Sequence, residues 1–247
     1  MNPSIFSSLD PVSAANLGSL AETGNSRFRQ RKPGPAFARL SPHVLMSRRQ
    51  APAETNETHA GLMKNKALLL GTTGMLAAAA RHAAMQAEEA VIVSRHADSF
   101  SFGDEALDAK CVSLPFSYED EPALLAALES HAPFSLALTW IRPRAELLRA
   151  ALDALVAPGG TLIEVMGSRS ILAGPNGEPS IASIRADALA HQPDIAYAQV
   201  VLGFVRENGA SRWLTHEEIS AAAIAQMEMP LPRRIAGTLE PWDARPQ

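Results

Sequence analysis

From Lys66 onward, short apolar runs alternate with segments in which apolar residues recur every three or four positions. The short runs favour β-strands, whereas the periodic segments favour helices. The expected strands cover residues 67–70, 91–93, 111–114, 134–140, 161–166 and 200–205. The expected helices cover residues 75–86, 119–131, 144–156 and 180–190, and a last helix starts at the capping box Thr215-x-x-Glu218 and ends before Pro230.

Strands and helices that alternate in this way, with strands that lack a polar face, are typical of a parallel sheet covered by helices on both sides. We therefore predict an α/β fold, a Rossmann-like doubly wound parallel sheet of about six strands in a three-layer αβα arrangement. Right-handed crossovers and a glycine-rich first turn favour the strand order 3-2-1-4-5-6. In that order a ligand binds in the crevice at the carboxyl ends of the strands.

The two ends of the chain lack this pattern. Residues 1–62 are rich in Ser, Pro and Asn, and their seven basic and four acidic residues give a net charge of +3, against −7 for the rest. Such a segment buries too little apolar surface to offset its ordering entropy, so we interpret it as a disordered extension. A start codon assigned too far upstream of Met63 is an alternative, and we weigh both above an organellar transit peptide. The predicted Rossmann domain covers 63–229, and a polar tail follows at 230–247.

Composition and charge exclude several classes of protein. The 247 residues, 47% of them hydrophobic, can form a good core. The single cysteine, Cys111, excludes disulfide frameworks and Cys-clustered metal sites and is expected to be buried, and the histidines show no metal-ligand spacing. A net charge of −4 gives no general attraction to nucleic acid or anionic membranes, and no apolar stretch approaches the ~20 residues of a membrane span. We expect a cytoplasmic protein with no metal, nucleic-acid or membrane partner.

The candidate chemistry begins at the turn Gly71-Thr72-Thr73-Gly74-Met75-Leu76-Ala77. Gly71 lets the chain turn off the first strand, and Gly74 lets the backbone approach a pyrophosphate at the helix N-terminus. Ala77 keeps that helix close to the sheet. Because the motif lies between an apolar strand and a small-residue helix, it indicates a dinucleotide or similar phosphate ligand bound by residues 71–76. The alternative is a tight turn that only needs two glycines.

The end of the second strand bears on which ligand binds. NAD and S-adenosylmethionine sites usually present an acidic residue there for the ribose hydroxyls. This chain has Ser94-Arg95-His96 instead. A guanidinium can pair bidentately with a 2′-phosphate, so Arg95, with Ser94 beside it, favours NADP over NAD. The alternative is an exposed arginine without a role.

These residues resemble the short-chain dehydrogenase/reductase superfamily, whose members are NAD(P)-dependent oxidoreductases on a Rossmann fold. The resemblance covers about residues 63–229 and is closest to small, atypical bacterial members. It implies that Ser168, after the fifth strand, is a substrate-orienting catalytic serine, and that Thr139 and Trp140 line the nicotinamide side. The resemblance also implies that the protein forms a homo-oligomer. The segments that carry it are the glycine turn, Ser94-Arg95, Gly167-Ser168, 199–205 and 211–220.

One departure from the superfamily concerns its catalytic pair, Tyr-x-x-x-Lys, in which the tyrosine exchanges a proton with the carbonyl. The lysines are Lys32, Lys64, Lys66 and Lys110, and none follows the fourth strand. Neither Tyr118 nor Tyr197 has a lysine four residues later. The usual proton donor is therefore missing.

Other side chains expected near the carboxyl ends of the strands are arginines and a tryptophan. Arg142, Arg144 and Arg169 suit an anionic substrate or the cofactor phosphates, or form a solvated rim. Arg212-Trp213 either closes over the ligand or packs ahead of the last helix.

The leading hypothesis is an NADP(H)-binding oxidoreductase that acts on a small carbonyl or imine near Ser168 and Trp140. A non-catalytic dinucleotide-binding or sensor protein is the second hypothesis, favoured by the missing Tyr and Lys. An S-adenosylmethionine-dependent methyltransferase is the third, because Ala157-Pro158-Gly159-Gly160 before a strand resembles that class.

Overall fold

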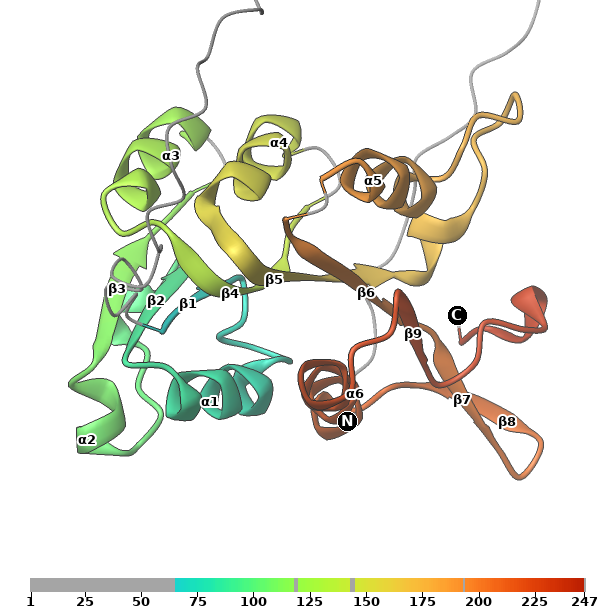
Figure 1. Cartoon of the computed structure of the whole chain (residues 1–247). Helices are drawn as coiled ribbons and strands as arrows, with labels where there is room; N and C mark the ends of the chain where they lie inside the picture. Colours follow the sequence, from blue (N-terminus) through green and yellow to red (C-terminus); the bar gives the residue numbers. More distant parts are fainter. Residues whose placement is uncertain (1–64, 118–119, 143–144, 193, 247) are drawn as a thin grey trace, which may run out of the picture. The chain divides into compact units, whose positions relative to one another are not determined.

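The computed structural model describes residues 65–117, 120–142, 145–192 and 194–246, and strands and helices alternate through them as predicted (Figure 1). The extension predicted at 1–62 lies outside the described residues. The strands are β1 (Lys66–Leu70), β2 (Glu89–Ser94), β3 (Cys111–Pro115), β4 (Phe134–Trp140), β5 (Val156–Gly167), β6 (Ala196–Leu202), β7 (Phe204–Glu207), β8 (Ala210–Trp213) and β9 (Arg233–Ala236). The helices are α1 (Ala77–Gln86), α2 (Glu105–Asp108), α3 (Glu121–Glu129), α4 (Glu146–Leu155), α5 (Ile181–Ala190) and α6 (His216–Glu228), with 3-10 helices at Ala97–Ser99, Ser168–Ile171 and Trp242–Ala244.

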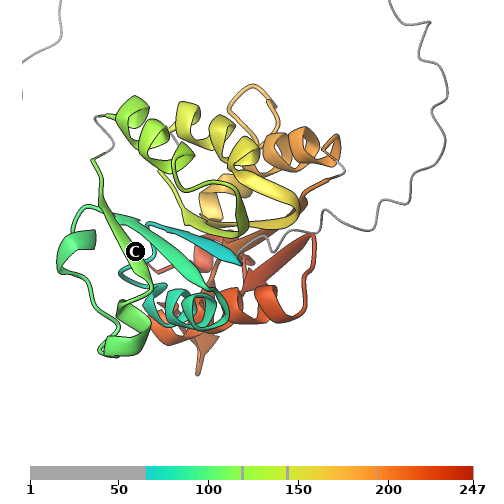
Figure 2. The same ribbon diagram turned by 60° about the vertical axis from the view of Figure 1, so that its left-hand side comes forward.

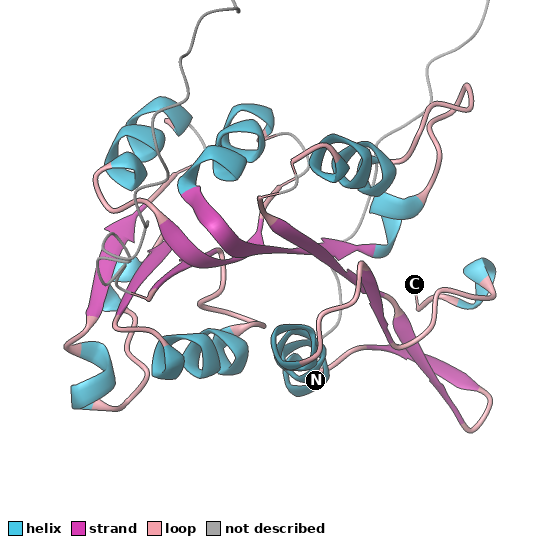
Figure 3. Cartoon of the chain, viewed as in Figure 1, coloured by secondary structure: helices cyan, strands magenta, loops and turns pink. Residues whose placement is uncertain are grey.

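Seven strands form one sheet in the order β3-β2-β1-β4-β5-β6-β9, and every neighbouring pair is parallel. The predicted order 3-2-1-4-5-6 is confirmed, and with it the Rossmann-like α/β class. Helices α3, α4 and α5 cover one face of the sheet, and α1 and α6 cover the other (Figures 1 and 3). Figure 2 shows α1 and α6 side by side under the sheet, in agreement with their mutual contacts. The arrangement has the three predicted layers.

The seventh strand, β9, lies where the sequence predicts only a polar tail. It pairs with β6, with Arg233 beside Gln199 at one end of the register. Both of its arginines bond to the rest of the fold: Arg233 Nε donates to the side-chain oxygen of Gln199 at 2.8 Å, and Arg234 Nε donates to that of Gln226 at 3.0 Å. Because two adjacent residues of the four in β9 are charged, this strand shows no apolar pattern in the sequence. The sheet therefore extends into the segment 230–247.

The predicted strand 200–205 is two strands. β6 ends at Leu202 and β7 begins at Phe204. Gly203, between them, packs so closely on Thr238 that a β-carbon would overlap its carbonyl oxygen. β7 and β8 form an antiparallel hairpin that projects from the body (Figure 1). Asn208 and Gly209 connect the two strands with φ values of +51° and +80°. An Asn-Gly pair with two positive φ values is typical of a tight hairpin turn.

The centre of the sheet face under α1 and α6 is apolar. Leu69 pairs in register with Ile92 and Leu138, and the same row continues through Ile163 to Ala198, all of them buried. Helix α1 packs on this face through its alanines, whose small side chains allow helix and sheet to approach closely. The buried alanines of α1 are Ala79, Ala80, Ala83 and Ala84.

Two smaller predictions can be compared with the structure. Helix α6 has the predicted capping box, in which Thr215 accepts from the Glu218 amide at 3.2 Å and Glu218 accepts from the Thr215 amide at 2.8 Å. Cys111 is half-buried rather than buried, and burial raises the pKa of its thiol. Within the described part of the chain, no helix is both long enough and apolar enough to span a membrane.

Candidate functional site

The first glycine of the turn after β1 is fixed by packing. Gly71 has φ of +71°, and a β-carbon at this position would overlap the carbonyl oxygen of Trp140. Its amide donates to the Val93 carbonyl at 2.8 Å, which joins the ends of β1 and β2. A side chain is therefore strained here both by the positive φ and by the close approach. Gly71 brings the chain out between β2 and β4 at the carboxyl edge of the sheet.

The second glycine borders open space. A β-carbon on Gly74 would meet nothing within 4 Å. Helix α1 begins three residues later, its N-cap residue Leu76 supplies no side-chain acceptor, and its first turn contains no acidic residue. The partial positive charge of this helix end is thus not neutralised by its own side chains, and an anionic group can bind there.

The turn opens into a cavity of about 300 Å³, which we call the glycine-turn cavity. It lies over the carboxyl ends of β1, β2 and β4, where open α/β sheets bind their ligands. None of the described residues that line it is acidic. The lining consists of Leu70, Gly71, Thr73, Gly74, Val93, Ser94, Arg95, His96, Phe116, Trp140 and Arg142.

Two neighbouring residues of this lining fit a phosphorylated ligand. The hydroxyl of Ser94 is buried and has no hydrogen-bond partner among the described residues. Because an unsatisfied buried hydroxyl is costly, a ligand oxygen that bonds to it would complete the site. Arg95, the next residue, is exposed at the same cavity and offers a guanidinium to a phosphate.

Two further cavities share residues with the first and continue the carboxyl edge. The α4–α5 cavity, of about 280 Å³, shares Trp140 and Arg142 with the glycine-turn cavity. The C-terminal cavity, of about 710 Å³, shares Gly167 and Arg169 with the α4–α5 cavity. The remaining lining of the α4–α5 cavity is Ile141, Arg149, Met166, Ser170 and Ile181, and that of the C-terminal cavity is Ser168, Trp213, Trp242, Asp243, Arg245 and Pro246.

The structure brings together part of the predicted cofactor site. Six predicted residues line the glycine-turn cavity: Gly71, Thr73, Gly74, Ser94, Arg95 and Trp140. Four others do not line it: Thr72 and Leu76 are fully buried, Met75 accepts a hydrogen bond from Ser220 through its carbonyl, and Thr139 donates to the Ile163 carbonyl at 3.3 Å from a buried position. Their side chains support the turn and the sheet instead.

The residues predicted near the substrate lie at the other two cavities. Ser168 follows β5 and is largely buried at the C-terminal cavity, where half-exposed Trp213 also lies. Arg142 and Arg169 both line the α4–α5 cavity, as their predicted clustering requires, whereas Arg144 lies outside the described residues. Arg212 is held by Glu207 and Glu218 at 2.9 and 2.8 Å, so it joins the hairpin to α6.

A row of polar residues crosses the sheet under α4 and α5, and the sequence analysis did not anticipate it. Thr139, Glu164, Gln199 and Arg233 are register neighbours on four adjacent strands. The side chain of Glu164 is 2% exposed at the centre of this row. The prediction that the strands lack a polar face is therefore wrong for β5 and β6.

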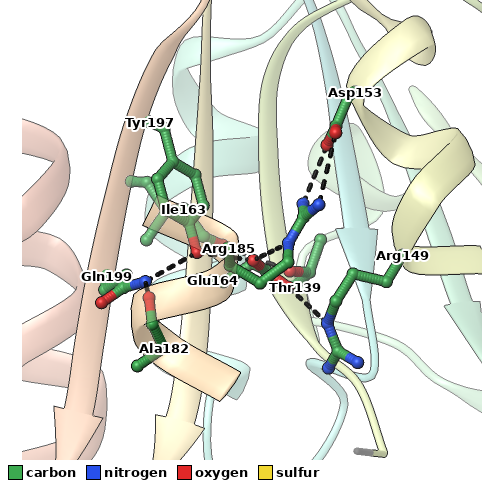
Figure 4. Close-up of polar contacts among 9 residues, drawn as sticks. All are labelled: Thr139, Arg149, Asp153, Ile163, Glu164, Ala182, Arg185, Tyr197 and Gln199. Carbon is green, nitrogen blue, oxygen red and sulfur yellow. Dashed lines mark hydrogen bonds and ion pairs between the residues drawn. The ribbon is translucent and has the colours of Figure 1, made fainter. Parts of the chain in front are cut away.

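Arginines from both covering helices neutralise Glu164 (Figure 4). Arg149 Nε of α4 donates to Oε1 at 3.0 Å, and Arg185 Nε of α5 donates to Oε2 at 2.9 Å. The terminal nitrogens of Arg185 donate to both oxygens of Asp153 at 2.8 and 3.3 Å. Burial alone lowers the pKa of Arg185, but its bonds to Asp153 and Glu164 outweigh this, and the net shift is upward.

Tyr197 belongs to this network and not to a catalytic pair. Its hydroxyl donates to Glu164 Oε2 at 2.6 Å, and burial followed by the charge of Glu164 raises its pKa. It lies near the start of β6, away from the carboxyl edge, as predicted. Both lysines of the described residues are at the opposite edge, where Lys66 begins β1 and Lys110 precedes β3. Within the described chain, no group of His, Cys, Asp and Glu is placed to hold a metal ion.

Comparison with known proteins identifies the fold. No protein-family model and no curated protein sequence matches the chain. A solved short-chain dehydrogenase/reductase family protein matches with a TM-score of 0.50 and 15% identity, over 70% of this chain and 96% of that chain. A short-chain dehydrogenase from Streptomyces avermitilis matches with a TM-score of 0.50 and 13% identity, over 71% and 88%. The chain has the fold of a short-chain dehydrogenase.

A third solved structure, of a protein proposed to be a betaketoacyl-ACP reductase, matches with a TM-score of 0.52 and 15% identity, over 70% of this chain and 95% of that chain. At such identities the likeness concerns the short-chain dehydrogenase fold and not the roles of single residues. The roles considered below therefore rest on the cavities and contacts of this chain.

Proposed function

We propose that this protein is an NADP(H)-dependent oxidoreductase that acts on a small carbonyl or imine. The observation that carries the proposal is the glycine-turn cavity at the carboxyl edge. There the turn meets an uncapped helix N-terminus, an exposed arginine and a buried hydroxyl that has no partner among the described residues. The short-chain dehydrogenase fold of the chain supports the same kind of ligand.

Each feature of the cavity suits one part of the dinucleotide. The open space at Gly74 and the first amides of α1 suit the diphosphate. Arg95 suits the 2′-phosphate through charge-assisted hydrogen bonds, and the Ser94 hydroxyl supplies a further donor beside it. Trp140 forms a wall between this cavity and the α4–α5 cavity.

The chain's own residues bind and orient the reactants, while a bound nicotinamide supplies or accepts the hydride. Ser168, which follows β5 and lines the C-terminal cavity, donates a hydrogen bond to the substrate carbonyl and orients it. Trp140 excludes water from the side of the cavity that it covers. Water completes the proton transfer, since Tyr197 is bound to Glu164 and the described lysines lie at the other edge.

The proposal is tested by calorimetric titration of the full chain with NADPH and NADH. We expect the wild-type protein to prefer NADPH, and Arg95→Ala to weaken NADPH binding by about tenfold or more with little effect on NADH, because a charge-assisted bond to the 2′-phosphate is lost. Arg81→Ala is the matched control, since it removes a half-buried arginine of α1 that pairs with Asp104 outside the cavity. Equal binding of NADPH to both variants would contradict the role of Arg95.

A non-catalytic dinucleotide-binding protein is the second candidate, and the engagement of Tyr197 by Glu164 favours it. It predicts NADPH binding without oxidation of NADPH in a screen of aldehydes, ketones and imines. A titration with S-adenosylmethionine tests the methyltransferase hypothesis, which the basic Arg95 at the end of β2 disfavours. Binding of S-adenosylmethionine without binding of either nicotinamide dinucleotide would replace the proposal.

A further inference from the structure

We propose that the C-terminal cavity binds an aromatic ring of the substrate, and that Trp213 and Trp242 are the residues that contact this ring. The inference rests on the proposed function for its catalytic meaning, since it names the substrate class of the same site: a carbonyl or imine that carries an aromatic group. Ser168, to which the proposed function assigns the carbonyl, lines the same cavity.

Three segments that lie far apart in the sequence form the C-terminal cavity. Ser168 and Arg169 follow β5, Trp213 ends β8, and Trp242 begins the 3-10 helix after β9. Figure 1 shows the hairpin and the chain after β9 at the same end of the sheet. The cavity volume of about 710 Å³ lies within the usual range for ligand sites, about 300–1,000 Å³, so a ring and a reacting group fit together.

Tryptophan is concentrated at this cavity. The chain has three tryptophans, and two of them line it. Trp213 is 50% exposed, although a large aromatic side chain gains free energy when it is covered. Large apolar side chains that gather at a concave surface are typical of a ligand site. An aromatic ring bound here would cover the exposed part of Trp213.

The hairpin holds Trp213 at the cavity. Trp213 pairs in register with Phe204, which is fully buried. Arg212, the preceding residue, pairs with Glu218 of α6 at 2.8 Å, and its guanidinium also donates to the Trp213 carbonyl at 3.2 Å. The sequence left two roles open for Trp213, contact with a ligand or packing ahead of α6. Its place in the lining of the cavity favours contact with a ligand.

The segment after β9 holds Trp242 at the cavity. Thr238 and Phe204 exchange two backbone hydrogen bonds, of 2.8 and 2.9 Å, which fasten the start of this segment to β7. The guanidinium carbon of Arg245 lies 3.7 Å from the centre of the Trp242 ring, and Arg245 Nε donates to the Trp242 carbonyl at 2.9 Å. Because this ring is already oriented, little conformational entropy is lost when a ligand packs against it.

The charges of the lining do not select an ion of one sign. Arg169, Arg245 and Asp243 all line the cavity, and the guanidinium of Arg245 lies over Trp242. Selectivity therefore depends on the two indole rings. Aromatic rings pack on one another edge-to-face or with an offset, and such pairs are stabilised beyond the effect of the buried area. A saturated ring lacks this additional stabilisation.

Calorimetric titration of the full chain with two ketones, without any cofactor, tests the proposal in the absence of turnover. The probes are benzylacetone and its analogue with a cyclohexyl ring in place of the phenyl ring. We expect benzylacetone to bind at least about threefold more tightly, because only its ring forms aromatic pairs. The cyclohexyl ring buries at least as much apolar surface, so buried area alone does not produce this preference.

Substitutions at the two tryptophans locate the preference. We expect Trp213→Leu and Trp242→Leu each to reduce it, and the double variant to bind both ketones equally. Trp213→Phe and Trp242→Phe keep an aromatic ring and are expected to keep part of the preference. Phe100→Leu is the matched control, since it removes a half-buried ring that contacts Phe102 outside the cavity, and it should change nothing.

The indole N–H signals of the wild-type protein in NMR spectra give a second measurement, which keeps the test decisive if a Leu variant does not fold. The two Phe variants assign the signals. Addition of benzylacetone should shift the signals of Trp213 and Trp242 more than that of Trp140, which lines the other two cavities.

Four outcomes would overturn the proposal. They are a wild-type protein that binds neither ketone or binds both equally, a full aromatic preference in the double Leu variant, a loss of the preference in Phe100→Leu, and a largest indole shift at Trp140. Failure of the wild-type protein to bind NADPH would instead overturn the proposed function. The ketone titrations contain no cofactor and would still report on this cavity.

Discussion

The two faces of the sheet use neighbouring residues of the same strands in different ways. Under α1 and α6, Leu138 on β4 and Ile163 on β5 are packed among apolar side chains. One residue along each strand, Thr139 and Glu164 face α4 and α5 and belong to a polar network. The first face is stabilised by the burial of apolar surface area, and this stabilisation does not depend on the direction of the side chains. The second depends on directed bonds, which orient a guanidinium at the edge of a cavity.

The difference has a functional consequence. An apolar face holds its helices against the sheet but gives no side chain a fixed polar direction. The polar network fixes Arg149 of α4 and Arg185 of α5 on a single carboxylate. Because Arg149 also lines the α4–α5 cavity, the stability of this face and the geometry of that cavity depend on the same contacts.

The largest expected effect comes from the centre of the polar face. Glu164→Leu removes the carboxylate to which both arginines donate, and breaking a buried charge set in this way typically costs about 3–5 kcal/mol. We expect a loss of that size in the free energy of unfolding, measured with urea. Glu164→Gln is the conservative control and should lose less, because an amide oxygen still accepts one of the bonds. A loss below about 1 kcal/mol for Glu164→Leu would show that the network does not hold this face.

The matching change on the apolar face is Leu69→Ala. Leu69 is fully buried, so its truncation removes packing contacts and leaves a cavity, at a cost of about 3 kcal/mol. We expect this loss to be independent of pH between 6 and about 10, since no titrating group takes part. Urea unfolding at several pH values measures it. A loss that varies with pH would mean that titrating groups of the polar face also affect the stability of the apolar face.

A smaller effect is expected from Tyr197→Phe, which deletes the hydroxyl bonded to Glu164. Loss of a hydrogen bond to a charged group costs about 1.5–3 kcal/mol, and the lower end applies because Glu164 keeps both arginine partners. The pKa of Tyr197 is raised in the folded protein, so its stabilisation is full below the unfolded value of about 10 and falls as the pH rises above it. The difference between wild type and variant should therefore shrink above pH ~10. A constant difference at all pH values would contradict this.

The smallest effect concerns an ion pair outside both faces. Hydrogen bonds from Arg212, and from the Thr215 amide, lower the pKa of Glu218 to about 2. Its contribution is present above the unfolded pKa of about 4.3 and is lost as the pH falls through about 2. Titration of the Glu218 carboxyl by NMR should show this low pKa in the wild-type protein and a higher one in Arg212→Gln. A wild-type pKa of Glu218 near 4 would show that solvent screening removes the effect of this exposed ion pair, in contrast to the ion pairs of the buried network.

Features that depend on neighbouring residues in the sequence could be predicted. The strand order follows from the alternation of apolar runs and helices, because parallel strands need crossovers of one hand. The glycine turn was found because Gly71 and Gly74 stand between a strand and a helix, and the cavity lies at that turn. Arg95 could be singled out because the end of β2 lies at a known distance along the chain from that turn, and Arg95 lines the same cavity.

Features that depend on residues far apart in the sequence could not be predicted. Glu164 stands alone in an apolar strand, and its partners Arg149, Arg185 and Tyr197 come from two helices and a neighbouring strand. Only their packing shows that they meet. Strand β9 was missed because Arg233 and Arg234 look like a solvated segment, although both bond to buried side chains. Asn208-Gly209 was a local signal for the hairpin that the sequence analysis overlooked.

The most direct test of the site is a crystal structure of the full chain with NADP⁺. We expect the diphosphate to lie over Gly74 and the first amides of α1, with the 2′-phosphate within hydrogen-bond distance of Arg95 and the Ser94 hydroxyl. A dinucleotide bound away from the carboxyl edge, or bound there with its 2′-phosphate turned away from Arg95, would contradict the proposed cofactor site.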